Sequence, residues 1–351
     1  MKKKFIAITL TLAALIGALT LPSCQKKPER YTDYCFDYFD TATTIIGYAK
    51  SREAFDEVAA FVKGELSEYH RLYTIYHRYE DLENLCTINE LSGGTHRTVK
   101  VDERIIDMLE FSRDAYDLTH GKVNIAMGSV LSIWHDYRET GSDEPWNATL
   151  PPMERLQEAA LHTDIASLVI DRENLTVTLT DKDARLDVGA IAKGYAVEMI
   201  ARSLEEKGVS GYVLNVGGNV RTVGPKPDGE GWTVGIEDPQ KKSESGYLEY
   251  LTLSSHALVT SGSYQRYYTV DGVDYHHIID PDTLMPAGYF LSVSVVCPSS
   301  AMGDALSTAL FCMPLEEGLS LVESLSDTEA MWVDKDGARH YSSGFDKFIK
   351  K

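Results

Sequence analysis

The stretch Leu186–Tyr195, with the sequence LDVGAIAKGY, decides how the rest of the chain is interpreted. A short apolar run ends at Asp187, small residues follow, and apolar positions at helical spacing continue to Leu204. This pattern predicts a strand, a tight turn and then a helix. Small residues let a ligand approach the backbone closely, and a helix start offers free N–H groups to an anion. The turn, with Lys193, therefore either holds a phosphate-bearing cofactor or is a tight strand-to-helix connection with a solvated lysine.

The length and the net charge of the chain limit which kinds of ligand it can bind. The chain has 351 residues, of which 43% are hydrophobic and 25% are charged, and its formal net charge is -19. This length is enough to bury a large core. The acidic balance argues against nucleic acid as a partner, because binding a phosphate backbone needs a basic surface. For the same reason, an anionic ligand would need a local basic or metal site.

The first residues predict export. Lys2–Lys4 form a basic head, and Phe5–Leu21 is an apolar run with small residues, which is the layout of a secretory signal over residues 1–23. The sequence Leu21-Pro22-Ser23-Cys24 is similar to a bacterial lipobox. We therefore expect Cys24 to carry a lipid that anchors the protein to the cell membrane, facing the periplasm or the cell exterior. The alternative is a plain signal peptide followed by an incidental cysteine.

After a tether at residues 24–33, residues 34–351 are expected to form a single domain, because no repeat or clear linker interrupts them. Alternating and β-branched segments predict strands or hairpins at 34–48, 99–101, 168–171, 176–180, 212–216, 219–224, 232–236, 247–253, 257–260, 264–270, 273–279, 292–297, 330–333 and 339–341. Apolar residues at helical spacing predict helices at 54–76, 103–118, 153–161, 196–208, 300–310 and 318–325. The polar segment 136–152 is expected to be a surface loop. The expected fold class is α+β, with mixed or antiparallel sheets and packed helices.

Two small constellations could carry chemistry. Asp304 and Thr308 lie four residues apart on an expected helix and so share one face. Their oxygens suit Mg²⁺ more than zinc. On this pair alone the simpler explanation is an acidic first turn that complements the helix dipole, with Thr308 incidental. His276 and His277 are adjacent on an expected strand, so they point to opposite faces and at most one should face a given site. A histidine there could act as a general base, or it could be a surface residue beside a structural Asp-Pro turn.

Together these stretches resemble the ApbE family, the FAD:protein FMN transferases. The resemblance is carried by four blocks in family order: LDVGAIAKGYA at 186–196, LNVGGNVRTVG at 214–224, HHIIDPDTLMP at 276–286 and DALSTALF at 304–311. It implies an α+β flavin transferase fold that binds FAD as a substrate in a cleft, with Mg²⁺ bridging to the pyrophosphate. A Ser or Thr hydroxyl of an acceptor redox protein would then attack the phosphorus of the FMN half and release AMP. The alternatives are an FAD pyrophosphatase that uses water, and a non-enzymatic flavin-binding lipoprotein.

The resemblance also implies roles for individual residues. The metal ligands would be the side chains of Asp304 and Thr308 and the carbonyl of Ala190, with Ser307 as a further contact, and Asp304 would thereby also be catalytic. His277 would be the base that activates the acceptor hydroxyl. The expected FAD contacts are Phe39, Tyr76, Lys122, Val123, Asn124, Asp187, Lys193 and the backbone of Ile278. Tyr79 competes with Tyr76 for the role of stacking ring. The chain departs from the family pattern at Asn124 and Asn219, where an Asp is common.

Overall fold

The structure is a computed structural model of the chain, and it describes residues 27–92 and 97–351. The predicted signal at residues 1–23 and the predicted lipid site Cys24 lie outside the described residues. Within the described ranges, no helix combines the length and the apolar character needed to cross a bilayer.

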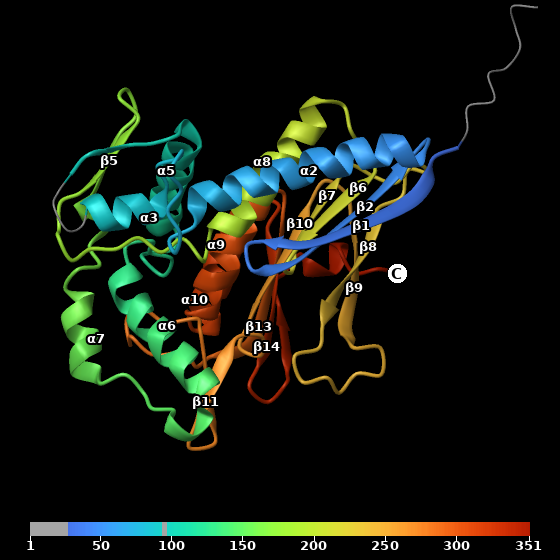
Figure 1. The fold of residues 1–351 in the computed structure, drawn as a ribbon. Coiled ribbons are helices and arrows are strands. Elements are labelled where there is room, and N and C mark those ends of the chain that lie inside the picture. Colours follow the sequence, from blue (N-terminus) through green and yellow to red (C-terminus); the bar gives the residue numbers. More distant parts are fainter. Residues whose placement is uncertain (1–26, 93–96) are drawn as a thin grey trace, which may run out of the picture.

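An eight-stranded sheet forms the centre of the molecule (Figure 1). Its strands lie in the order β1 (Glu29–Tyr38), β2 (Thr41–Ala49), β6 (Tyr212–Val216), β7 (Asn219–Val223), β10 (Ala257–Gly262), β13 (Phe290–Cys297), β14 (Glu329–Asp334) and β15 (Arg339–Tyr341). Each strand pairs antiparallel with its neighbour. With helices packed against it, this sheet confirms the expected α+β class.

Helices cover one face of the sheet: α2 (Arg52–Tyr73), α8 (Ala192–Glu206), α9 (Ser300–Phe311) and α10 (Leu315–Glu323). The apolar stripe of α2 that the sequence predicts is buried there, with Phe55, Val62 and Leu66 fully inaccessible. The Phe55 ring stacks on Tyr212 of β6, with ring centroids 6.0 Å apart. Burial of this stripe against the strands, more than helix propensity, holds α2 in place.

Smaller units surround this sandwich. The strands β3 (Val99–Lys100), β5 (Thr176–Leu179) and β4 (Leu168–Asp171) form a three-stranded sheet beside α3 (Leu85–Thr87) and α5 (Glu103–Leu118). A separate apolar cluster joins α6 (Gly128–Asp143) and α7 (Met153–Ala160) to the hairpin of β11 (Tyr267–Val270) and β12 (Val273–His276). The hairpin of β8 (Trp232–Glu237) and β9 (Tyr247–Leu253) packs over the second face of the main sheet, together with Phe345 and Phe348.

Two expected elements are wrong. The run that ends at Asp187 is not a strand of any sheet. On one side it forms only an isolated parallel bridge with residues 125–128, where the Asp187 N–H donates to the Ile125 carbonyl at 2.8 Å and the Gly128 N–H donates to the Arg185 carbonyl at 3.0 Å. On the other side the Asn89 side chain takes both backbone groups of Leu186: its Oδ1 accepts from the N–H at 2.7 Å and its Nδ2 donates to the carbonyl at 2.9 Å. The expected loop at 136–152 is helical up to Asp143. Gly141 is buried in this helix, and the Tyr268 ring occupies the space where a side chain at that position would lie.

The expected tether at 24–33 is also too long. The strand β1 begins at Glu29, which pairs with Ala49, and Arg30 pairs with Tyr48. Because β2 continues to Ala49, its backbone pairs with the residues from Glu29 onward and extends β1 into this polar segment. The segment has no apolar alternation that would predict a strand.

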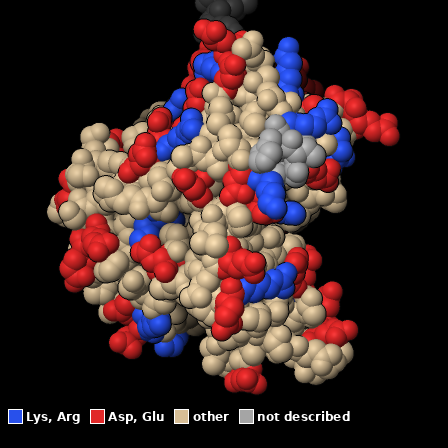
Figure 2. Space-filling model, turned by 90° about the vertical axis from the view of Figure 1, so that its left-hand side faces the viewer, with Lys and Arg blue, Asp and Glu red and all other residues tan. Residues whose placement is uncertain are grey.

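Charge is mixed on the surface. Figure 2 shows the left-hand side of Figure 1, where Asp and Glu side chains are spread over the surface with Lys and Arg among them, and no continuous basic area is visible on that face. The four cysteines at 35, 86, 297 and 312 are buried free thiols.

Candidate functional site

The turn before α8 opens onto a pocket of about 170 Å³ at one end of the main sheet. Its walls include four of the predicted FAD contacts, namely Phe39, Tyr76, Asp187 and Lys193. Ligand pockets are typically about 300–1,000 Å³, so a dinucleotide would extend from this pocket over the neighbouring surface. Residues far apart in the sequence thus converge where the turn chemistry predicts a ligand.

Phe39 lies in a strained two-residue turn between β1 and β2. Phe39 and Asp40 have positive φ angles of 55° and 49°, a conformation that a bulky side chain such as Phe rarely adopts. The Phe39 N–H donates to Nδ1 of His70 at 3.2 Å, and the two rings meet edge to face. Such strain costs about 1–3 kcal/mol and is concentrated at binding sites, which supports a role for this turn in the pocket.

The structure distinguishes between the two candidate stacking tyrosines. The side chain of Tyr76 is 55% exposed, lines the pocket and has its ring centroid 5.2 Å from that of His135. The ring of Tyr79 lies under the Arg71 guanidinium, 4.8 Å from the ring centroid, and is not part of the pocket wall. Tyr76 is therefore the ring that is free to stack on a ligand.

The start of α8 and the middle of α9 are in direct contact. The Gly194 N–H donates to Asp304 Oδ2 at 2.7 Å, and Lys193 Nζ lies 3.3 Å from Asp304 Oδ1. A Cβ on Gly194 would lie only 2.4 Å from both Asp304 Cβ and the Ser300 carbonyl oxygen, so only glycine permits this approach. Asp304, which is 5% exposed, thus satisfies one free N–H of the first turn of α8 and faces the predicted anion-binding turn.

Asn219, one of the two departures from the family pattern, belongs to this junction. Its Oδ1 accepts a hydrogen bond from Lys193 Nζ. Its Nδ2 is buried against Gly194 and has no partner among the described residues. The Asn219 amide accepts a hydrogen bond from Lys193 without adding a negative charge. Within this junction, Asp304 is therefore the carboxylate that Lys193 contacts.

Hydroxyl groups continue the donor set along α9. Ser261 Oγ of β10 lies 2.9 Å from Ser307 Oγ and 3.4 Å from Thr308 Oγ1. Ser307 is fully buried and also donates to the Asp304 carbonyl at 3.1 Å. Ala190 is half-buried in the turn just before α8. A carboxylate with neighbouring hydroxyl oxygens is the ligand chemistry that Mg²⁺ accepts, so the residues present fit the ion. Their roles as metal ligands stay predictions.

A second group of ionisable side chains lies outside the pocket. His162, Asp181 and Asp183 bring their nitrogen and oxygen atoms within 4.8 Å of one another. His162 Nδ1 is already bonded to Asp181 at 2.7 Å, so the group is explained as a local hydrogen-bonded cluster.

The two adjacent histidines point in different directions, as the strand alternation predicts. His276 is buried: its Nε2 lies 2.9 Å from the Ala287 carbonyl, and its Nδ1 accepts from the Ile278 N–H at 3.2 Å. His277 Nδ1 lies 3.2 Å from the carbonyl of Arg266, a residue of the pocket wall. Burial, and then the positive charge of Arg266, lower the pKa of His277 to about 4. His277 is therefore neutral at pH 7, and if Nδ1 carries the proton then Nε2 is free to accept one.

The remaining predicted FAD contacts are held in internal bonds. Lys122 Nζ pairs with Asp280 at 3.0 Å and Asp282 at 2.7 Å, which ties the 122–124 loop to the segment after His277. Val123 is buried, Asn124 donates to the Thr163 carbonyl at 2.8 Å and accepts from the Ala126 N–H, and the Ile278 carbonyl accepts from the Ala287 N–H. None of these four residues lines the 170 Å³ pocket. Their contact with a flavin stays a prediction.

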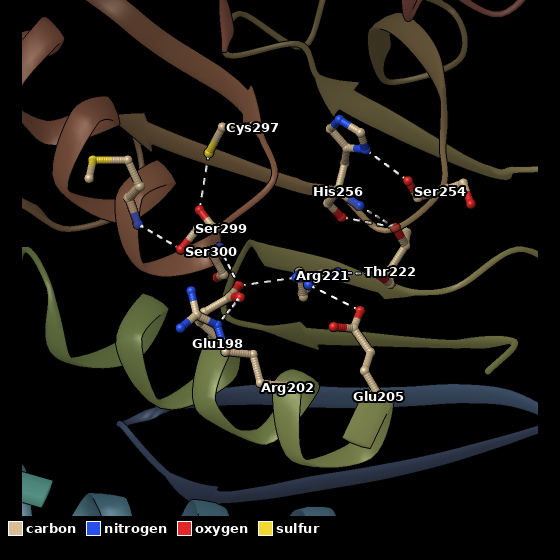
Figure 3. A network of polar contacts seen from close by, with 11 residues as sticks. Glu198, Arg202, Glu205, Arg221, Thr222, Ser254, His256, Cys297, Ser299 and Ser300 are labelled. Carbon is tan, nitrogen blue, oxygen red and sulfur yellow. Dashed lines mark hydrogen bonds and ion pairs between the residues drawn. The ribbon is translucent and has the colours of Figure 1, made fainter. Parts of the chain in front are cut away.

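A buried ion pair fixes α8 against α9 and β7 (Figure 3). Glu198 Oε2 of α8 accepts from Arg221 Nε at 3.1 Å and from the Ser300 N–H at the start of α9 at 2.8 Å. Both charged side chains are less than 5% exposed, and Arg202 adds a third bond to Glu198. Removing one partner of such a pair leaves a buried uncompensated charge. This network therefore holds the two helices whose contact forms the Gly194–Asp304 junction.

The pocket wall also contains residues that sequence reasoning missed: Asp40, His70 and Arg266. Each comes from a different element. Asp40 belongs to the stretch FDTATTI at 39–45, which weakly supports the family resemblance, whereas His70 and Arg266 lie in no motif. Arg266 reaches the Asp40 carbonyl at 3.4 Å across 226 positions of sequence. Only the folded chain brings these residues together.

The fold and the site define an α+β protein in which a lysine-bearing helix start lines one pocket and is bonded to Asp304 of α9, a residue that does not itself line that pocket. A helix start that carries a lysine is suited to an anionic ligand. The sequence profile of the ApbE family matches residues 39–332. A relative from Vibrio cholerae named FAD:protein FMN transferase is 29% identical over 97% of this chain and 99% of its own length. A relative of that name from Treponema pallidum is 30% identical over 74% of this chain and 73% of its own length. The crystal structure of the ApbE protein from Thermotoga maritima superposes with a TM-score of 0.79 at 28% identity, covering 92% of this chain and all of that one. The chain belongs to the ApbE family.

Proposed function

We propose that this protein transfers FMN from FAD to a Ser or Thr hydroxyl of an acceptor redox protein and releases AMP, with Mg²⁺ as its metal. As a member of the ApbE family, whose matched relatives are named FAD:protein FMN transferase, the chain is an enzyme of the flavin transferase class. The observation that carries the proposal is the contact between the Gly194 N–H and Asp304, because it brings the turn proposed to face the anion together with the carboxylate proposed to hold the metal.

The chain's own residues provide for the charge of FAD. Lys193 and the N-terminal end of α8 would face the pyrophosphate, and Asp304, Thr308 and the Ala190 carbonyl would hold the ion. When bound, Mg²⁺ would neutralise the phosphate charge that develops during substitution at phosphorus. An acidic protein can in this way bind an anionic dinucleotide. Tyr76 and Phe39 offer rings to one of its planar groups.

His277 would accept the proton of the acceptor hydroxyl at Nε2. The hydroxyl oxygen forms a bond to the phosphorus of the FMN half, the bond from that phosphorus to the AMP phosphate oxygen breaks, and AMP leaves. The contact between Nδ1 and the Arg266 carbonyl orients the ring for this step. Because its pKa is about 4, His277 is unprotonated throughout the neutral range.

Incubation of the protein with FAD, Mg²⁺ and an acceptor domain, followed by mass spectrometry, tests the proposal. A covalent FMN adduct on the acceptor supports transfer. Free FMN and AMP without an adduct support the hydrolase alternative, and tight FAD binding without AMP release supports a flavin-binding lipoprotein.

We further propose that the protein is exported and anchored by a lipid on Cys24, which would place the site beside membrane redox proteins. The sequence around Leu21–Cys24 supports this proposal. Cys24→Ala is expected to move the protein from the membrane fraction to the soluble fraction of the cell envelope. Retention of the variant in the membrane fraction would overturn the lipid anchor.

A further inference from the structure

A second and larger cavity, of about 580 Å³, lies on the face of the main sheet opposite α8 and α9. We call it the β8 groove. Its floor includes Thr44 and Ile46 of β2 and Leu258 of β10, and one wall is formed by four consecutive residues of β8, Trp232–Gly235. In Figure 1 the β8–β9 hairpin lies beside β1 and β2, on the side away from α6 and α7. The transfer chemistry described above makes no use of this cavity.

The strand β8 offers an unpaired edge to the groove. On one side β8 pairs with β9, and β9 is paired in turn with the C-terminal segment, where the Thr252 N–H donates to the Phe348 carbonyl at 2.8 Å. On its other side β8 has no backbone partner within residues 27–92 and 97–351. An open strand edge is a template for an extended polypeptide, whose backbone can complete the hydrogen-bond ladder.

The groove ends beside the reaction site. Tyr264 and Gln265 line the groove, whereas the next residue, Arg266, lines the pocket that contains Lys193. The carbonyl of the same Arg266 is the group that His277 Nδ1 contacts. The short segment 264–266 is thus a ridge with the groove on one side and the proposed base on the other.

The lining favours a polypeptide over a nucleotide. Its Lys226 is already paired with Glu230 at 3.0 Å, and Glu237 would repel a phosphate. Arg30, at the end far from the ridge, has no carboxylate within ion-pair distance among the described residues, so it could pair with an acidic side chain of a bound segment.

The floor from Thr44 to Tyr48 is about 13 Å long at 3.3 Å per residue, which is the length of about four extended residues.

We propose that the β8 groove binds an extended segment of the acceptor polypeptide, which lies along the free edge of β8 and directs the acceptor Ser or Thr over the ridge to His277. This inference rests on the proposed transferase function. It assigns recognition of the acceptor to a surface separate from the FAD pocket.

The test uses the full-length protein, FAD, Mg²⁺ and a purified redox domain that one of the matched transferases flavinylates. Thr44→Trp fills the floor of the groove without touching the FAD pocket. The KM for the acceptor domain is expected to rise at least about tenfold, equivalent to about 1.4 kcal/mol of binding free energy, while FAD affinity stays within about twofold. Val169→Trp, on the half-exposed face of β4, is the matched control and should change neither quantity.

Hydrogen exchange of the unsubstituted protein provides a second measurement that does not depend on a variant folding. Addition of the acceptor domain should slow exchange of the β8 amides at 232–237 and leave those of β4 unchanged. If wild-type protein transfers FMN but Thr44→Trp keeps the wild-type KM and β8 gains no protection, the groove is not the acceptor site. A loss of FAD affinity in Thr44→Trp would assign the groove to a small ligand, and a concentration-dependent dimer that the variant abolishes would assign it to a second copy. Both results would overturn the inference, whereas absence of transfer by the wild-type protein would refute the proposed function itself.

Discussion

Gly194→Ala tests the junction on which the site depends. The added Cβ would lie 2.4 Å from Asp304 Cβ and 2.4 Å from the Ser300 carbonyl oxygen, whereas ordinary contacts begin near 3.4 Å. The helix α9 must therefore move about 1 Å away from α8. It cannot simply rotate, because the Ser300 N–H is bonded to the buried Glu198 carboxylate.

The expected magnitude has two parts. Overpacking a close contact costs about 1–3 kcal/mol, and this contact involves backbone on both helices, so the upper value applies. Alanine has a higher helix propensity than glycine, which by itself stabilises the folded state by about 1 kcal/mol. We expect the free energy of unfolding to fall by about 2 kcal/mol. Since the shift also separates Asp304 from Lys193, the transfer rate should fall about 100-fold, as expected for a 1 Å misplacement.

Urea denaturation and a transfer assay, both run against Gly64→Ala, measure these effects. Gly64 lies within α2 and has no atom near the position of its missing Cβ, so this matched variant should gain up to about 1 kcal/mol and keep full activity. If Gly194→Ala is as stable and as active as Gly64→Ala, then α8 and α9 do not form the close junction described here.

Three further predictions concern the chemistry. His277→Ala should bind FAD normally, but its transfer rate should fall about 10²–10⁴-fold. His276→Ala should mainly lower thermal stability, because it removes two buried hydrogen bonds. Equal transfer rates for the two variants would show that His277 is not the base. Asp304→Asn keeps an acceptor for the Gly194 N–H but loses the charge, so it should fold normally while Mg²⁺ no longer stimulates transfer, and Mg²⁺-stimulated transfer in this variant would contradict the metal assignment. Because the pKa of His277 is about 4 in the folded state and about 6.5 in the unfolded chain, the unfolded chain binds the proton first, and stability should fall by at most about 3 kcal/mol as the pH drops from 6.5 to 4. Urea titrations of wild type and His277→Gln at several pH values check this, since the variant should lack that part of the slope.

Periodicity predicts most of the fold. The helix expected at 103–118 and the strand expected at 247–253 have these same bounds in the structure, because their apolar patterns are buried against one face each. The helix up to Asp143 could not be predicted in this way, since its polar residues and Gly141 favour a loop locally, and the contact of Gly141 with Tyr268 comes from a distant hairpin. The segment before Asp187 is held by a single parallel bridge to residues 125–128 on one side and by the Asn89 side chain on the other, and local periodicity predicts neither contact.

Some residues of the candidate site could be predicted from the sequence and others could not. Lys193 and Asp304 lie in local sequence patterns that indicate a ligand site, and the fold brings the two side chains into contact. Arg266 and Ser261 carry no such pattern, because their place in the site depends only on how β10 and the ridge pack beside α9 and β2. The β8 groove also has no signal in the sequence, since it arises from the packing of a hairpin over a sheet face.

The most direct test of the central claim is intact mass measurement of an acceptor domain after incubation with FAD and the protein, with and without Mg²⁺. We expect one FMN per acceptor and an equal amount of AMP, both dependent on Mg²⁺ and abolished by Asp304→Ala. Undiminished transfer in the presence of a chelator, or by the Asp304→Ala variant, would contradict the role assigned to the junction of α8 and α9.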